Sequence, residues 1–289
     1  AITLNNVLDW SIDHPEMPNI ELKNQDLQGL NFEHLNLSNS NFRKAKFDTA
    51  KISNVNFTGA NLSYTNLSGH NLTETILIDT DLSYSILTGM DLSGMDLSGA
   101  RLVGVDLSNS ILTGMDLTGT VLRGADLSYS ILTGVDLSGM DLSGARLVGM
   151  DLTGTVLRGA DLSYSILTGV DLSGMDLSGA RLVGVDLTGM DLTGTILIDT
   201  DLSDSILTGV DLSGMDLTGV KLTSVNLSGM DLTGTVLRGA DLSHTNLSNT
   251  ILTDANLENA ILENANLIDA NLDSANLTNA NLRKSLLVD

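Results

Sequence analysis

Residues 121–149 read VLRGADLSYSILTGVDLSGMDLSGARLVG, with a leucine at every fifth position. The same period runs without a gap from Leu22 to Leu287, so that a Leu, Ile or Phe centres 54 consecutive five-residue units. On an α-helix, five residues turn the side chain by about 140°, so these residues would form no stripe. On a flat strand, successive central residues would point to opposite faces. The period therefore predicts a backbone that turns a corner every five residues and coils around stacked leucines.

The other four positions of the unit support this interpretation. The position two before the centre is small or apolar in most units, and the position directly before the centre is Asp or Asn in 34 of the 54 units. Ser or Thr usually follows the centre. The position two after the centre holds all 28 glycines of the chain. Because glycine adopts positive φ at little cost, we expect a turn at or beside that position.

The units Ala60–Tyr64 (ANLSY), Ala125–Tyr129 (ADLSY) and Ala265–Asp269 (ANLID) match the pentapeptide-repeat consensus A-(D/N)-L-x-x. The chain resembles this family over roughly residues 20–289. The resemblance implies an all-β fold, a right-handed quadrilateral parallel β-helix with four units per coil. The central position and the position two before it would line the interior. About 13 coils would follow, which make a rod about 65 Å long at a strand separation of about 4.8 Å.

Residues 1–19 precede the repeat and are expected to form an N-terminal cap, followed by one β-helix over residues 20–289. A short helix is predicted from about residue 4 to 13, with Thr3 as its N-cap and Pro15 as its stop. Its apolar residues have helical spacing and are Leu4, Val7, Leu8 and Ile12. We expect this helix and Trp10 to cover the first coil, because the end of a β-helix exposes unpaired edges. A docking peptide for a partner is the alternative interpretation.

The other end of the repeat offers no such cover in the sequence, since the last residue, Asp289, comes two positions after the last central leucine. The unpaired edge of the C-terminal coil is a template for another chain. We therefore expect the C-terminal coil either to pair end to end with a second copy, as a homodimer, or to fray.

The net charge of −22 and the isoelectric point of about 4.1 restrict the class of partner. Direct binding to nucleic acid or to an anionic membrane is disfavoured, and a basic surface of a protein partner is favoured. The chain contains no cysteine. No signal peptide or apolar run long enough to cross a bilayer is recognisable. We expect a cytoplasmic protein, with a secreted effector delivered to a host cell as the alternative.

Motifs for catalysis or cofactor binding are not found in the sequence. The four histidines, His14, His34, His70 and His244, are scattered and have no metal-ligand spacing. No phosphate-binding loop, dinucleotide fingerprint or nucleophile elbow occurs. Glycines spaced by five residues are explained by the repeated turn. We therefore expect no enzyme, no cofactor and no metal site.

Two functions fit these observations. The first is a non-catalytic acidic rod that acts as a protein–protein interaction module, scaffold or bacterial effector domain. Near-identical internal copies, such as residues 121–149 and 156–184, suit a surface in which length matters more than individual side chains. The second is suggested by the family resemblance, because some pentapeptide-repeat proteins mimic DNA. Such a protein binds DNA gyrase or a related topoisomerase and confers resistance to gyrase-targeting toxins.

With four units per coil, residues twenty positions apart stack on one side, and one column of aspartates is unusually long. Like charges in register destabilise a sheet, so the column needs an explanation. One explanation is turn chemistry, in which each carboxylate accepts hydrogen bonds from its own turn. The other is recognition, in which a negative ridge meets a basic groove on a partner. The candidate partner-binding residues are Asp151, Asp171, Asp191, Asp211 and Asp231, together with Asp96, Asp116 and Asp136 on the adjacent side.

Overall fold

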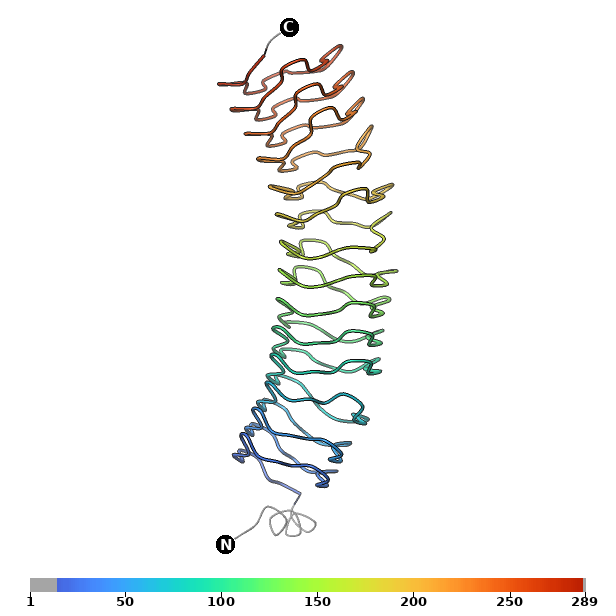
Figure 1. Ribbon diagram of the computed structural model, residues 1–289, viewed down its shortest axis with the longest axis vertical. Coiled ribbons are helices and arrows are strands. Elements are labelled where there is room, and N and C mark those ends of the chain that lie inside the picture. Colours follow the sequence, from blue (N-terminus) through green and yellow to red (C-terminus); the bar gives the residue numbers. More distant parts are fainter. Residues whose placement is uncertain (1–14, 288–289) are drawn as a thin grey trace. The chain divides into compact units, whose positions relative to one another are not determined.

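The computed structural model describes residues 15–287. The helix expected at residues 4–13 therefore lies outside the described residues. Within residues 15–287 the chain contains no helix, and its β-structure consists of single bridge residues rather than extended strands. Each bridge residue lies directly before a central residue, and two turn residues follow the centre. Figure 1 shows the result as a succession of stacked turns of the chain.

The chain divides into two compact units, which are described separately. Unit 1 comprises Ala1–Asp136 and Ala145–Thr155, and unit 2 comprises Leu137–Gly144 and Val156–Asp289. The single β-helix predicted over residues 20–289 therefore stays a prediction.

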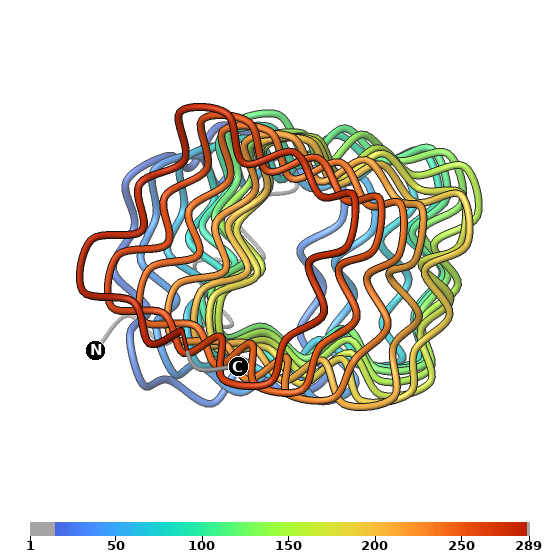
Figure 2. The same ribbon diagram turned by 90° about the horizontal axis from the view of Figure 1, so that it is seen from above.

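Within each unit, parallel bridges join residues that are twenty positions apart. Asn36 pairs with Asn56 in unit 1, and Asp201 pairs with Lys221 in unit 2. Backbone N–H groups donate between neighbouring coils, as from Leu82 to the carbonyl of Arg101 at 2.9 Å. Four five-residue units therefore make one coil, and Figure 2 shows the four-sided outline of the turns. The predicted all-β coil with four units per turn is confirmed.

The four sides are numbered here by their central residues. Side 1 contains Leu22 and every twentieth residue after it. Sides 2 and 3 begin in the same way at Leu27 and Phe32, and side 4 begins at Met17. The described ladder starts at Glu16, which lies inside the segment that the sequence assigns to the cap. It does so because Met17, 7% exposed, fills the central position one unit before Leu22.

The corners are made by the position two after the centre. Every such residue from Asn19 to Lys284 has positive φ, whether it is one of the 28 glycines or one of the 26 other residues. In most units the N–H group three residues after the centre donates to the carbonyl of the central residue, as from Ala100 to Leu97 at 2.9 Å. The left-handed residue and this hydrogen bond together match the type II turn, and the predicted turn position is confirmed.

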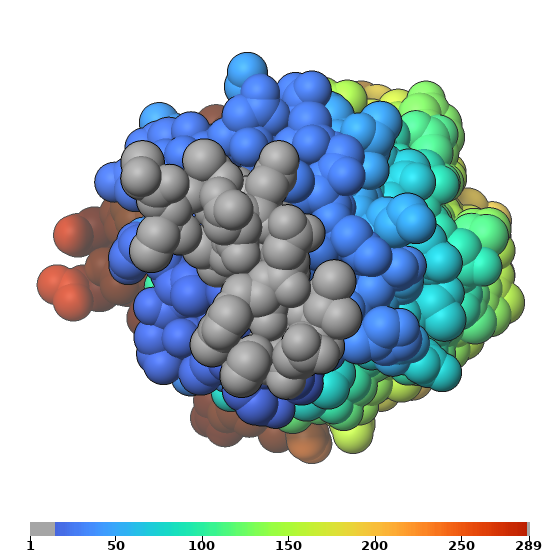
Figure 3. All heavy atoms as spheres, turned by 90° about the horizontal axis from the view of Figure 1, so that it is seen from below, coloured from blue at the N-terminus to red at the C-terminus, as the bar shows by residue number. Residues whose placement is uncertain are grey.

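The central residues form the core, as the sequence predicts. Between residues 60 and 280 none of these leucines is exposed, and only Leu272 and Leu277, in the last coils, are half-buried. Leu287, the last central residue, is 54% exposed. The end-to-end homodimer through this coil stays a prediction. Figure 3 views the molecule from the end of the first coils, whose atoms are coloured blue.

Most polar residues two before the centre are buried and keep hydrogen-bond partners, whereas the buried hydroxyls of Ser165 and Ser205 have none. The Thr75 hydroxyl donates to the carbonyl of Ile52 at 2.9 Å, and the Ser85 hydroxyl donates to the carbonyl of Leu82 at 2.6 Å. A short hydroxyl side chain can therefore replace alanine at the inner corner, because the donor bonds the nearest backbone oxygen.

Candidate interaction surface on side 3

The long aspartate column lies on side 3. Asp171, Asp191, Asp211 and Asp231 belong to unit 2, and all four are exposed. The charge of Asp191 acts on Asp171, and that of Asp211 acts on Asp231, so the structure brings these carboxylates together in pairs. The four residues are called the side-3 column below.

The remaining predicted residues lie in unit 1. Asp151 is on side 3, and Asp96, Asp116 and Asp136 are on side 4. Asp96 and Asp116 form a parallel bridge and are therefore neighbours in successive coils.

Each aspartate of the side-3 column is bound by its own turn. The Oδ1 atom accepts the backbone N–H of the residue two positions later, at 2.9 Å from Ser173 and 2.8 Å from Thr193. The Ser173 and Ser213 hydroxyls also donate to the Oδ1 atoms of Asp171 and Asp211, at 2.7 Å. The turn-chemistry explanation of the column is thereby confirmed. It fixes one oxygen of each carboxylate and leaves the recognition role open as a hypothesis.

These hydrogen bonds lower the pKa of every carboxyl group in the column. The hydroxyl of the residue two positions later has the largest effect and its backbone N–H the next. Both donors favour the ionised form. Repulsion from the neighbouring carboxylate acts in the opposite direction on the pKa of Asp171 and of Asp231, and it is the weakest of the causes. The column is therefore fully ionised at neutral pH.

The lowered pKa values predict a pH dependence of stability. Because each carboxyl has a folded pKa below its ordinary value of 3.8, the unfolded chain binds more protons near that pH. The stabilising contribution is complete above about pH 4 and is lost as the pH falls through the lowered pKa values. The free energy of unfolding of the wild type, minus that of a variant with all four aspartates changed to Asn, should therefore decrease from about pH 6 to about pH 2.5. Urea unfolding of both proteins measures it, and a constant or rising difference would contradict the assignment.

In unit 2, side 3 has the most aspartates of the four sides, six, and no Lys or Arg, whereas side 2 also lacks Lys and Arg but has only three aspartates. On side 1, by contrast, Arg181 contacts Asp161 at 3.2 Å and Lys221 contacts Asp201 at 3.9 Å, between nitrogen and carboxylate oxygen. Over the whole chain, Asp directly before the centre occurs five, four, six and five times on sides 1 to 4, so this count alone does not separate the sides. The positions of Lys and Arg twenty residues after an Asp are the signal that separates side 3 from side 1.

The backbone ladder is open along the side-3 column. Asp171, Asp191 and Asp211 form no bridge in the described structure, whereas Asp231 pairs with Ile251. The side chains that stack two before the centre along this stretch are bulky, and at a spacing of about 4.8 Å they crowd one another. They are Val170, Met190, Val210 and Met230, whereas the next residue in the stack is the smaller Thr250. Repulsion between the stacked carboxylates also weakens the pairing between these coils.

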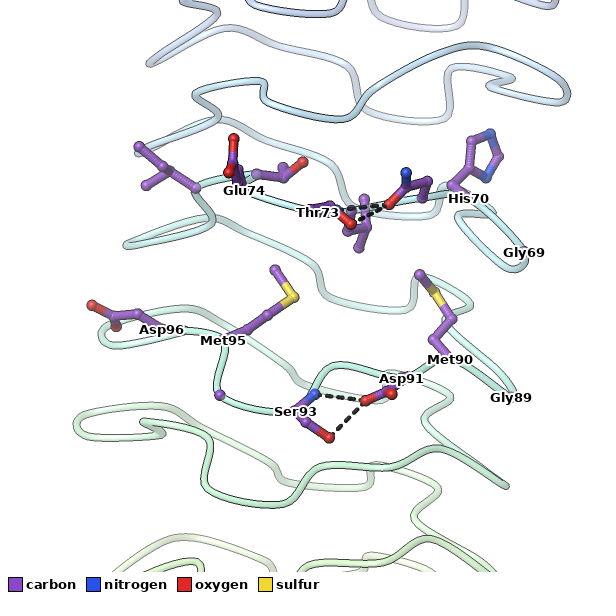
Figure 4. Close-up of a pocket in the computed structure, with 15 residues that line it drawn as sticks. Gly69, His70, Thr73, Glu74, Gly89, Met90, Asp91, Ser93, Met95 and Asp96 are labelled. Atoms are coloured by element: carbon purple, nitrogen blue, oxygen red, sulfur yellow. Dashed lines mark hydrogen bonds between the residues drawn. The ribbon is translucent and has the colours of Figure 1, made fainter.

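Two shallow hollows mark such openings. One lies in unit 2 beside Asp211 and Asp231, with Thr208, Ser213 and Ser228 in its wall. The other lies in unit 1 and is shown in Figure 4, where Met90 and Met95 rise from the lower coil into the space between two coils. There His70 and Met90 occupy the corresponding side-3 positions, and Asn71 forms no bridge in the described ladder. Each hollow includes a residue at which the ladder is open, Asp211 in the first and Asn71 in the second.

The described residues contain no group of three or more His, Cys, Asp or Glu side chains arranged to hold a metal ion. Among residues 15–287 there is also no helix that is long and apolar enough to span a membrane. The arrangement that remains is a row of exposed, ionised carboxylates, each with one oxygen held by its own turn. Chemically, such a row attracts cations and positively charged side chains.

Solved structures of several pentapeptide repeat proteins are similar to this chain. HetL, involved in heterocyst differentiation regulation in the cyanobacterium Nostoc sp. strain PCC 7120, is 24% identical, with 100% of this chain and 98% of that chain covered and a TM-score of 0.25. Full-length QnrB1, a plasmid-mediated fluoroquinolone resistance protein, is 21% identical over 72% of this chain and 93% of that chain, with a TM-score of 0.31. Rfr23 from the cyanobacterium Cyanothece 51142 is 21% identical over 56% and 98%, with a TM-score of 0.17. A search of the curated proteins found no match.

The sequence itself matches the family model for pentapeptide repeats in overlapping segments that together run from residue 19 to residue 287. Proteins of this family fold as right-handed quadrilateral β-helices, and with the parallel bridges between coils this confirms the predicted fold class. With nearly the whole chain matched, the protein belongs to the pentapeptide-repeat family.

Proposed function

We propose that this protein is a non-catalytic interaction module that binds a basic surface of a protein partner through side 3 of unit 2. The observation that carries the proposal is the side-3 column, four exposed aspartates on a side without Lys or Arg. A basic partner is attracted by all four carboxylates of the column, because no Lys or Arg on this side of unit 2 neutralises them. A net charge of −22 favours the same class of partner and repels nucleic acid.

The turns make the column suitable for recognition. Since Oδ1 of each aspartate is held by the turn, the carboxylate is fixed before a partner arrives, and less side-chain entropy is lost on binding. The other oxygen is left to accept a charge-assisted hydrogen bond from Arg or Lys. Repetition at one carboxylate per coil presents a linear pattern, which fits a groove lined with cationic side chains.

A second candidate function is DNA mimicry towards a gyrase-type topoisomerase. The observation that favours it is the same column, because stacked ionised carboxylates resemble a row of phosphates. Their spacing is about 4.8 Å per charge, wider than the about 1.7 Å of axis per charge in duplex DNA. QnrB1, one of the similar proteins, is a fluoroquinolone resistance protein. The wider spacing places this function second.

The first experiment compares two variants with equal charge. The side-3 variant carries Asp171→Asn, Asp191→Asn, Asp211→Asn and Asp231→Asn. The control variant carries the same change at four aspartates on the other sides of unit 2, which are Asp186, Asp201, Asp216 and Asp241. These four accept the same turn hydrogen bond and lie outside the side-3 column. Asn keeps that bond, as Asn246 does with the N–H of Ser248 at 3.2 Å, so both variants should fold.

Immobilised wild type, side-3 variant and control are exposed to lysate of the source organism, and retained proteins are identified and purified. We expect a basic protein that binds the wild type and the control but loses at least tenfold in affinity for the side-3 variant. Equal affinity for both variants would show that side 3 has no recognition role. Supercoiling by purified DNA gyrase tests the second candidate, since inhibition by the wild type that the side-3 variant lacks would favour the mimic.

A further inference from the structure

All four tyrosines of the protein stand at outer corners, two after a centre, where φ is close to +60°. Glycine occupies 28 of these positions without strain, so a large side chain there calls for a reason. Three of the rings lie against the glycine of the next coil. A Cβ atom added at Gly104, Gly149 or Gly184 would meet the ring of the tyrosine twenty residues earlier at 2.6, 2.8 or 2.5 Å.

The fourth ring shows what the other face of such a tyrosine binds. The guanidinium of Arg43 lies over the ring of Tyr64, 5.0 Å from its centroid, and the Lys44 ammonium is 5.4 Å away. Both cations come from the preceding coil. On the following coil Tyr84 stacks on Tyr64, with centroids 5.0 Å apart and planes inclined by 20°. The Tyr64 ring therefore contacts cations of the preceding coil on one face and the Tyr84 ring of the next coil on the other.

Tyr129 and Tyr164 have the same ring position but receive no cation from the described chain. The preceding coil presents Asn109 to Tyr129 and Gly144 to Tyr164. A Cβ atom added at Gly144 would meet nothing within 4 Å. These two tyrosines are 62% and 67% exposed, against 45% for Tyr64.

The coils that flank each open ring face carry aspartate side chains. Asp141 pairs with Asp161 in a parallel bridge on the side of Tyr164, and Asp106 pairs with Asp126 in the same way on the side of Tyr129. Beside Tyr64 the corresponding positions are neutral, Asn41 and Asn61.

At each open site, one of the two aspartates is paired with an arginine. Arg146 contacts Asp126 and Arg181 contacts Asp161, each at 3.2 Å, and both arginines belong to the coil after the tyrosine. Asp106 and Asp141, the aspartates of the preceding coil, form no ion pair with a Lys or Arg of residues 15–287. Compared with Tyr64, the open face of each ring therefore lacks a cation from the described residues and has an unpaired carboxylate nearby.

We propose that the open ring faces of Tyr129 and Tyr164 are two equivalent binding sites for cationic side chains, arginine above all, of a basic protein partner. The ring supplies a cation–π contact, and Asp106 or Asp141 supplies the counter-charge. The identity of the partner class rests on the proposed function, but the sites lie outside the side-3 column. Both sites take the same chemical group, because the segments 121–149 and 156–184 with the tyrosines are identical and the preceding coil has Asp-Leu-Ser at both 106–108 and 141–143.

The test uses full-length protein with ring-labelled tyrosine, which gives four sets of NMR signals. Tyr129→Phe and Tyr164→Phe assign the two sites by removing one set each. The probe is a tetra-arginine peptide, and a tetra-citrulline peptide is the uncharged control. We expect tetra-arginine, but not tetra-citrulline, to shift the ring signals of Tyr129 and Tyr164 and to leave those of Tyr64 and Tyr84 in place. Changing both open tyrosines to Asn should weaken binding by about two- to fivefold per ring, and Phe should retain it.

Two results would overturn the proposal. One is tetra-arginine binding without any shift of the Tyr129 and Tyr164 rings, and the other is an equal shift of all four tyrosines. The side-3 variant separates this proposal from the proposed function, since its ring sites are intact. It should still show the ring shifts even if it has lost the protein partner, and ring shifts that vanish in it would also contradict separate cation sites.

Discussion

Replacing Phe42 with alanine is expected to lower the free energy of unfolding by about 3–5 kcal/mol, the range for deleting a buried phenyl ring. Phe42 is fully buried, and its ring centroid lies 5.6 Å from that of Phe47 and 5.5 Å from that of Phe57. The ring of Phe32 is also in contact, at 6.3 Å. Alanine would leave a cavity among the four phenylalanines of the chain, which the rigid coil backbone cannot close. The loss of edge contacts between rings adds to the loss of buried area.

Urea unfolding followed by circular dichroism measures the effect, and hydrogen exchange of the first coils locates it. Phe42→Leu is the matched control, because leucine is the usual central residue and leaves a smaller cavity. We expect its cost to be clearly lower than that of alanine. If alanine and leucine cost the same, or if alanine costs less than about 1 kcal/mol, the aromatic cluster is not a tightly packed core.

Deleting the single residue Ser203 is expected to abolish the ordered coils that follow it in unit 2. The deletion shifts the phase of every later residue by one position. Central leucines would then occupy positions that now face solvent, and the position of Leu207 would be taken by the hydroxyl residue Thr208. Residues at the corners would no longer be those that tolerate positive φ. All central residues after position 203 would leave the core, and a change in one turn cannot bring them back.

Deleting the twenty residues 200–219 is the control, since it removes one coil and keeps both the five-residue phase and all four sides in register. We expect the shorter protein to unfold cooperatively with only a modest change in stability, whereas the Ser203 deletion should lose protection from hydrogen exchange beyond residue 203. Retained protection of those later coils after the single-residue deletion would disprove the strict five-residue phase.

The sequence alone determined the coil. The central leucines, the confinement of glycine to one position and the Asp or Asn before each centre are all local features of five residues. Each acts within its own turn, as the hydrogen bond from Ser173 to Asp171 shows. A turn that is encoded by its own residues needs no knowledge of the neighbouring coil, so the pattern predicts the fold and the buried residues directly. The stacking of positions twenty apart followed from the family resemblance.

What the tertiary structure decided is how stacked side chains differ from one coil to the next. Val170, Met190, Val210 and Met230 each suit an inner corner by themselves, yet in succession they accompany an open ladder. The Arg43 guanidinium lies over the ring of Tyr64, whereas the ring of Tyr164 has no cation of the described chain over its open face and is 67% exposed. These outcomes depend on size and charge across a coil boundary, twenty residues away in the chain. A period of five residues describes each layer, whereas packing between layers is set by the particular pair of side chains that meet.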